Sequence, residues 1–289
     1  MRQLQFLIAC LCFSLVSCNG TKPQTTSSKP LILVSLPPYK TLVEQVAGQD
    51  FDVIAVVPVS ADPHSYEPTS RQLSQLSKGE IWFRIGESFE SKLLPLLPAK
   101  PVDLRNSVLM MEEGGCHCHG HDTQDRHIWL SPKLMASQAT TIAKELSYLY
   151  PEHAVEFQKR LAALELELVS LDRNIQAKIE GKTDRSFLVS HPAFAYFCRE
   201  YNCHQLSVEH EGKEPRPKEV DQLLFAAIEQ QAKVAISLPQ HNNKGAQLIA
   251  GKLHIPVRMI DPYAADYAQT MLTLASLIAN PYQPLSNAK

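Results

Sequence analysis

One short segment of the chain concentrates side chains that bind transition metals. It runs from Gly114 to Pro132 and includes His127 near its end. Five further thiol or imidazole groups fall within six consecutive positions: Cys116, His117, Cys118, His119 and His121. Imidazole and thiolate suit zinc and its transition-metal neighbours, not calcium or magnesium. Because glycines flank the cluster and no apolar period runs through it, we predict a loop that captures zinc weakly, with a solvated polar loop of no specific role as the alternative.

Four candidate ligands share their place relative to the expected elements, since each adjoins the end of a strand or the start of a helix. They are His64, His127, His191 and Asp261. In open parallel sheets, ligands bind at the carboxyl ends of the strands. Any one of these histidines alone would more often be a structural residue, but the shared placement predicts that two donors from each half of the chain hold one metal. Three imidazoles and a carboxylate fit tetrahedral Zn²⁺ and leave no open position for a water nucleophile, which favours a carrier over an enzyme.

Carboxylates near these ligands are candidates for a supporting role. A metal-bound histidine usually donates its other ring N–H to a carboxylate or a carbonyl. The candidates are Asp62, Glu67, Asp125 and Glu209. The alternative for each is a solvated surface carboxylate, and the sequence does not pair them with particular histidines.

The first half of the chain alternates strands and helices. Apolar runs predict strands over residues 31–36, 51–57 and 81–85, with shorter extended pieces at 102–104 and 108–111. Helical spacing predicts helices over 39–46, 70–77, 90–97 and 132–148. The last of these has Ser131 as its N-cap and Pro132 in its first turn. Buried strands that alternate with helices indicate a parallel sheet covered on both faces.

A single apolar stripe runs along residues 152–180. From Phe157 onward its members recur at steps of four and three: Leu161, Leu164, Leu168, Leu171, Ile175 and Ile179. The stripe predicts one helix of roughly 40 Å, at 1.5 Å per residue, that ends near Gly181. A helix of this length can join two lobes stiffly. A coiled coil is the weaker alternative, because there are fewer than four clean heptads and no supporting charge pattern.

A second α/β set follows the long helix. Strands are predicted over residues 187–190, 203–208, 234–238 and 257–260, and helices over 193–200, 217–231, 244–253 and 263–278. Cys198 and Cys203 lie five positions apart across a helix-to-strand junction, where either a disulfide or two buried thiols would fit. The predicted fold class is therefore α/β, with two sets of parallel strands joined by a long rigid helix.

The N-terminus has the features of an export signal. Arg2 precedes an apolar segment, residues 4–16, that is too short to span a bilayer. The segment ends in Leu15-Val16-Ser17-Cys18, which resembles a bacterial lipobox with Cys18 as the lipidated first mature residue. An ordinary secretory signal cut nearby is the alternative. Residues 19–30 are rich in Ser, Thr, Lys and Pro and are predicted to be a flexible tether.

The composition limits the partners. The 289 residues suffice for two medium domains, and a hydrophobic content of 44% suits a globular core. A formal net charge of −2 offers no electrostatic case for nucleic acid or an anionic membrane as a partner. Eleven histidines are many for this length, and four of them crowd into residues 114–132, which favours metal handling.

Four motifs together resemble a known family. They are Asp62-Pro-His-Ser-Tyr-Glu-Pro-Thr69, Asp125-Arg-His-Ile-Trp-Leu-Ser-Pro132, His191-Pro-Ala-Phe-Ala-Tyr-Phe197 and Asp261-Pro262. In this order they look like the motifs of the cluster A-I solute-binding lipoproteins of bacterial ABC transporters, which bind zinc or manganese. The resemblance covers about residues 31–278. It implies two Rossmann-like lobes joined by a long rigid helix, with His64, His127, His191 and Asp261 holding the metal between the lobes, and delivery to a membrane permease.

The resemblance also shapes the choice of metal and its fourth ligand. Manganese-binding relatives look to have glutamate where this chain has His191, and a third nitrogen donor favours zinc, with Mn²⁺ or Fe²⁺ as alternatives. The run after Asp261 lacks the glycine and the later asparagine common in the family. Asp266 could therefore compete as the carboxylate ligand, and His241 is a histidine for which the resemblance does not call.

These inferences combine into one expectation for the whole chain. We expect a lipid-anchored, monomeric solute-binding protein in the periplasm or at the cell surface, with a signal at 1–18, a tether at 19–30, lobes at 31–150 and 183–289, and a linking helix at 151–182. A secreted zinc hydrolase is one alternative, but the His-Glu-x-x-His pattern is absent from the sequence. A surface adhesin with an incidental metal site is another.

Overall fold

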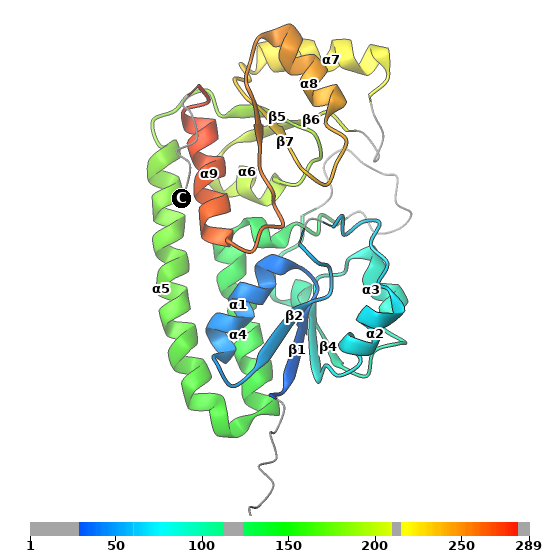
Figure 1. Cartoon of the computed structure of the whole chain (residues 1–289). Coiled ribbons are helices and arrows are strands. Elements are labelled where there is room, and N and C mark those ends of the chain that lie inside the picture. The colour runs from blue at the N-terminus through cyan, green and yellow to red at the C-terminus, as the bar shows by residue number, and fades with distance from the viewer. Residues whose placement is uncertain (1–28, 60, 112–123, 210–214, 283–289) are drawn as a thin grey trace, which may run out of the picture.

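Two parallel sheets organise the molecule. The computed structural model describes residues 29–59, 61–111, 124–209 and 215–282. Each sheet has four strands, in the orders β2-β1-β3-β4 and β6-β5-β7-β8, and every pairing in both is parallel. The two sheets form separate lobes, one above the other in Figure 1, and a single long helix runs beside both. The predicted α/β class with two parallel sheets is confirmed.

The first sheet is built from the first half of the chain. Its strands are β1 (Leu31–Val34), β2 (Asp52–Ala55), β3 (Ile81–Arg84) and β4 (Lys100–Asp103). The helices between them are α1 (Pro37–Ala47), α2 (Ser70–Leu76) and α3 (Ser88–Leu93). The central strands β1 and β3 are almost wholly buried, as continuous apolar runs require. The chain order reverses between β1 and β3, so the loops after the strands spread apart there and leave space at the carboxyl edge.

The second sheet repeats this topology. Its strands are β5 (Ser186–Val189), β6 (His204–Ser207), β7 (Ala235–Ser237) and β8 (Val257–Met259). Its helices are α6 (Ala195–Tyr201), α7 (Pro217–Glu229) and α8 (Lys244–Leu253). The order reverses between β5 and β7, at the place equivalent to the β1/β3 reversal. Each lobe therefore has one switch point where a ligand can lie.

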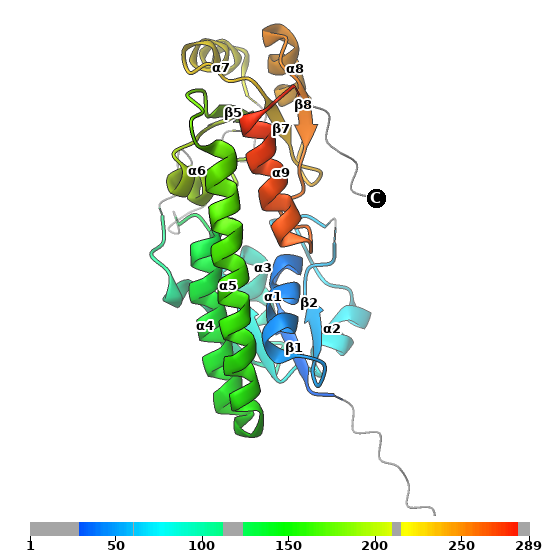
Figure 2. The same ribbon diagram turned by 90° about the vertical axis from the view of Figure 1, so that its left-hand side faces the viewer.

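Three long helices connect and support the lobes. They are α4 (Pro132–Leu149), α5 (Ala154–Ile179) and α9 (Tyr267–Ala279), with the short turn η3 (Pro151–His153) before α5. Figure 2 shows α4 and α9 packed along α5, which extends from the first lobe to the second. The predicted stripe is confirmed, because all seven of its members are buried on α5: Phe157, Leu161, Leu164, Leu168, Leu171, Ile175 and Ile179.

The structure confirms one predicted helix cap and differs from the sequence predictions at the start of the last helix and at residues 108–111. The Ser131 side chain accepts a hydrogen bond from the Leu134 N–H, so the predicted N-cap of α4 is confirmed. The last helix begins at Tyr267 instead of residue 263, because the Asp266 side chain accepts from the Gln269 N–H and caps it there. Residues 108–111 are not a strand; a 3₁₀ turn, η1 (Leu104–Ser107), ends the extended chain just before them.

Several predicted features are not tested by the described residues. Cys18 and the loop with Cys116, His117, Cys118, His119 and His121 lie outside them.

Cys198 and Cys203 are both free thiols in the structure, so of the two alternatives the disulfide is not formed. None of the helices in the described part of the chain has both the length and the apolar composition to cross a lipid bilayer.

The stripe on α5 generates a matched comparison of two leucines. Leu164 is 3% exposed, whereas Leu166, two positions on, is 73% exposed. We expect Leu164→Ala to lower the free energy of unfolding by about 2–5 kcal/mol, because it leaves a cavity in the core. Leu166→Ala should change it by no more than about 0.5 kcal/mol. Urea unfolding of both variants measures the difference, and equal losses would contradict the packing of α5 described above.

Candidate metal centre

Three of the four predicted ligands come together between the lobes. His64 lies in the loop after β2, His127 immediately before the turn η2 (Ile128–Leu130), and His191 two residues after β5. One donor nitrogen from each lies within 4.8 Å of the other two. The ring centroids are 6.1 Å apart for His64 and His127, 5.1 Å for His64 and His191, and 5.3 Å for His127 and His191. Two histidines of the first lobe thus face one of the second.

Buried hydrogen bonds fix the two lobes against each other beside these rings. The Trp129 indole N–H of the first lobe donates to the carbonyl of Pro262 at 2.8 Å. The Tyr196 hydroxyl of α6 donates to the carbonyl of Asp125 at 2.7 Å. Because both bonds are buried and both lie next to candidate ligands, they hold the histidines of one lobe at a set distance from those of the other.

A carboxylate faces the Nδ1 atom of each histidine. Asp125 Oδ1 lies 2.7 Å from Nδ1 of His127. Glu209 Oε2 lies 3.3 Å from Nδ1 of His191, and Glu87 Oε2 lies 3.5 Å from Nδ1 of His64. A carboxylate at Nδ1 fixes the proton on that nitrogen and leaves the Nε2 lone pair for another partner. This is the arrangement by which proteins orient histidines toward a metal.

The nitrogens on the opposite side of the buried rings have no partner. His127 is 4% exposed and His191 is 7% exposed. Among the described residues, nothing donates to or accepts from the buried Nε2 atom of either ring. A buried polar atom without a hydrogen bond is costly, so a group that supplies a partner would be strongly favoured here. A cation that accepts two or three imidazole lone pairs meets that requirement.

The position of Glu87 depends on a neighbouring buried carboxylate. Glu90 of α3 accepts hydrogen bonds from the Ser35 hydroxyl at 2.6 Å and from the N–H groups of Ile85 and Gly86 at 2.9 and 2.8 Å. These bonds hold the turn after β3, in which Gly86 has a φ of +85° that favours glycine. Glu87 follows directly and is directed toward His64. The sequence reading missed Glu87, although the rule used for the other ligands, a polar residue just after a strand, applies to it.

Burial and charge set the protonation states on the side of the second lobe. Burial lowers the pKa of His191 to about 3, against a smaller opposite effect of Glu209. Burial alone would raise the pKa of Glu209, but its hydrogen bonds with His191 and His241 outweigh burial and lower the pKa to about 2. At neutral pH the ring is therefore neutral and ready to ligate, and the carboxylate behind it is ionised.

The other candidate residues from the sequence are not part of the group formed by His64, His127 and His191. Asp261 is in none of the groups of three donor atoms that lie within 4.8 Å of one another in the described residues. Asp266 is the cap of α9, and Glu67 pairs with Lys92 on the surface. Asp62 accepts from the backbone N–H of His64 at 3.0 Å and so shapes the loop.

One histidine noted only as surplus in the sequence does reach the cluster. His241 forms one group of close donor atoms with Asp62 and His64, and another with His191 and Glu209. It follows β7, so it obeys the same rule of strand ends as the predicted ligands.

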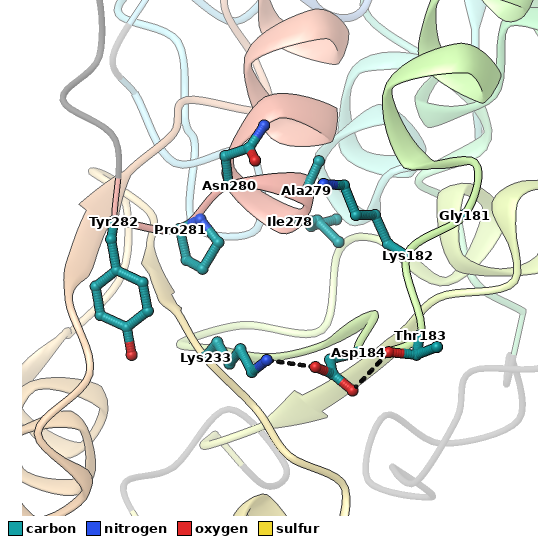
Figure 3. Close-up of a pocket in the computed structure, with 10 residues that line it drawn as sticks. All are labelled: Gly181, Lys182, Thr183, Asp184, Lys233, Ile278, Ala279, Asn280, Pro281 and Tyr282. Carbon is teal, nitrogen blue, oxygen red and sulfur yellow. Dashed lines mark hydrogen bonds and ion pairs between the residues drawn. The ribbon is translucent and has the colours of Figure 1, made fainter.

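A large hollow elsewhere on the molecule lacks metal ligands. It has a volume of about 470 Å³ and lies where the end of α5 meets the end of α9. Figure 3 shows that Asp184, the one carboxylate in its lining, is bonded to Lys233 and to the Thr183 hydroxyl. Its lining contains no histidine or cysteine. The hollow is therefore not an alternative metal centre.

Known proteins are similar to this chain along most of its length. The model of a family described as the periplasmic component A of a zinc-uptake complex matches residues 32–280. A protein of Chlamydia trachomatis serovar D, whose name assigns it metal binding only provisionally, is 33% identical over 276 residues, which are 95% of this chain and 99% of the relative. The zinc-binding lipoprotein AdcA of Streptococcus pneumoniae is 29% identical over 223 residues, 72% of this chain but 44% of AdcA.

A solved structure agrees with the described fold. The crystal structure of ZnuA is 35% identical to this chain and superposes with a TM-score of 0.81, covering 88% of this chain and 99% of ZnuA. The similarity therefore includes both sheets and the helix between them.

The low pKa of His191 predicts how the metal-free protein responds to acid. The unfolded chain takes up a proton at this ring below about pH 6.5, whereas the folded chain does not until about pH 3. Stability therefore falls as the pH is lowered through this range, by about 1.4 kcal/mol per pH unit for this one proton. We expect His191→Gln to remove that part of the slope between pH 6.5 and 5, measured by urea unfolding with a chelator present.

An exposed histidine provides the control. His204 lies on the exposed side of β6, and His204→Gln should keep the pH dependence of the unsubstituted protein. If His191→Gln kept it as well, His191 would not be held neutral in the folded chain.

Proposed function

The chain belongs to the family of periplasmic components of zinc-uptake complexes, and from this premise we propose that it captures one Zn²⁺ between its two lobes and delivers it to an ABC permease for import. The single observation that supports this most strongly is the convergence of three imidazoles from both lobes, each backed by a carboxylate. The family's members are solute-binding proteins, not enzymes, and the ion is the cargo.

We propose that Nε2 atoms of His64, His127 and His191 bind the ion, with a fourth protein ligand that was predicted from the sequence as Asp261. Zinc prefers four nitrogen, sulfur or oxygen ligands in a tetrahedron. Three neutral imidazoles favour zinc over manganese, which prefers oxygen. The relatives named AdcA are zinc-binding proteins, which supports the same choice for this chain. Mn²⁺ and Fe²⁺ remain the alternatives to test.

The charges around the rings support the capture of a cation. Glu87, Asp125 and Glu209 lie directly behind three of the imidazoles. For Glu87, burial acts to raise its pKa, but the contact with His64 and the charges of His127 and Arg126 together outweigh burial and lower it. The lowered pKa values of Glu87 and Glu209 keep negative charge beside the rings, which favours the approach of a divalent cation. Burial acts to lower the pKa of His64, but the neighbouring carboxylates, Glu87 foremost, outweigh burial and raise it, so a proton on this ring has to leave when the ion binds.

His64 is the ligand through which the ion is proposed to enter. Its side chain is 33% exposed, whereas those of His127 and His191 are 5% and 9% exposed. It lies in a loop and not in a helix or strand, so it can move toward the ion at low cost. The metal-capturing loop predicted at 116–121 would present zinc to this same centre.

Zinc binding is tested by titration of the purified protein against a competing chelator. We expect one tight zinc per chain, and no tight site in His64→Ala or His127→Ala, because each removes a ligand from a set that needs all of its members. His204→Ala should bind as the unsubstituted chain does, since His204 pairs with Ser186 at the start of β5, at the opposite end of that strand from His191. A chain that binds no stoichiometric Zn²⁺, Mn²⁺ or Fe²⁺ would contradict the proposal.

Lipid anchoring at Cys18 is tested separately, by labelling with palmitate in an exporting bacterial host. We propose that the mature protein is a monomer tethered through residues 19–30 to the membrane that holds its permease. The unsubstituted chain and Cys12→Ser should incorporate the label, because Cys12 leaves with the signal. Cys18→Ser should not. Equal labelling of all three chains, or of none, would show that Cys18 is not the anchor.

A further inference from the structure

His241 occupies a position that the three-histidine site does not explain. Its imidazole stacks on that of His191 with 4.0 Å between centroids and 11° between planes, and it lies 5.9 Å from the His64 ring. Its Nε2 atom is buried and has no hydrogen-bond partner among the described residues, as for His127 and His191. Three buried imidazole nitrogens without a partner, those of His127, His191 and His241, thus lie in or beside the groups of close donor atoms.

One carboxylate oxygen orients both stacked rings. Glu209 Oε2 lies 3.3 Å from Nδ1 of His191 and 3.5 Å from Nδ1 of His241. Since the two rings are nearly parallel and their Nδ1 atoms meet the same oxygen, their Nε2 atoms are directed to the same side. Neighbouring nitrogens around a tetrahedral zinc are roughly 3.3 Å apart, for Zn–N bonds of about 2.0–2.1 Å. The ring separation of 4.0 Å is close to this spacing, but the lone pairs of nearly parallel rings are themselves nearly parallel, so the His241 ring must turn for both nitrogens to bind one ion.

Asp261 is engaged elsewhere. Its Oδ1 atom accepts hydrogen bonds from the Gln240 side-chain amide at 2.8 Å and from the Tyr263 N–H at 2.9 Å. Gln240 is the residue directly before His241, so this carboxylate holds in place the turn that presents the His241 ring. Asp261 also belongs to none of the groups of close donor atoms in the described residues, so its bonds fit a residue that positions His241.

We propose that His241, and not Asp261, is the fourth ligand of the metal centre, which would then consist of four imidazoles. This inference rests on the proposed function and deepens it, because it specifies the coordination sphere and its selectivity. Four neutral nitrogen donors disfavour manganese more strongly than three nitrogens and an oxygen would. The charge of the ion is balanced by the carboxylates behind the rings, namely Glu87, Asp125 and Glu209, instead of by a carboxylate in the coordination sphere.

X-ray absorption at the zinc edge, combined with chelator competition, tests the assignment. In the unsubstituted chain loaded with one Zn²⁺ we expect four imidazole ligands. This measurement does not depend on whether any variant folds. His241→Ala, and His241→Gln as a second variant that keeps more of the side chain, should lose one imidazole and bind zinc more weakly by over about 100-fold. Asp261→Asn should keep all four imidazoles and lose about tenfold in affinity, the lower end of the range for a residue that supports a ligand. His204→Ala is the control with full affinity.

The outcomes separate this inference from the function on which it rests. A spectrum with three imidazoles and one carboxylate oxygen that Asp261→Asn removes, with unchanged binding in His241→Ala, overturns the assignment of His241 and leaves zinc capture standing. An unsubstituted chain that binds no zinc overturns both.

Discussion

The contact between an ionised carboxylate and the Nδ1 atom of an imidazole is the interaction on which the centre depends. It occurs at His64, His127, His191 and His241, with Glu209 shared by the last two. Each contact occupies Nδ1, leaves the Nε2 side of the ring for another partner and fixes the direction in which the ring faces. Burial keeps His191 neutral, so ligands are ready before any ion arrives. Without the carboxylates, the same histidines could rotate away from the shared space or bond to one another.

The fold places these pairs where they can meet. Each lobe is a parallel sheet whose order reverses at one point, and the loops that follow the strands carry the ligands and the carboxylates. The helix α5 extends along both lobes, and the buried bonds of Trp129 and Tyr196 cross between them close to the rings. Two lobes held in this way behave as one preformed site, so little ordering entropy needs to be offset when the ion binds.

Sequence reasoning found what periodicity and strand ends encode, and missed what only packing decides. Continuous apolar runs and the stripe from Phe157 to Ile179 predicted both sheets and α5, because burial requires those patterns. Placement after a strand or just before a helix found His64, His127 and His191, which lie together. It also selected Asp261, whose hydrogen bonds to Gln240 and Tyr263 no sequence pattern reveals. Pairing each ring with its carboxylate, and recognising Glu87 and His241 as parts of the site, depends on distances across the lobe interface.

The central claim is that one ion binds at the Nε2 side of the carboxylate-backed histidines, between the lobes. Crystals of the protein loaded with one equivalent of zinc, with data collected on both sides of the zinc absorption edge, test it directly. We predict a single anomalous peak within bonding distance of the Nε2 atoms of His64, His127 and His191, with their Nδ1 atoms still facing Glu87, Asp125 and Glu209. No peak between the lobes, or a peak bonded to Nδ1 atoms in place of the carboxylates, would contradict it.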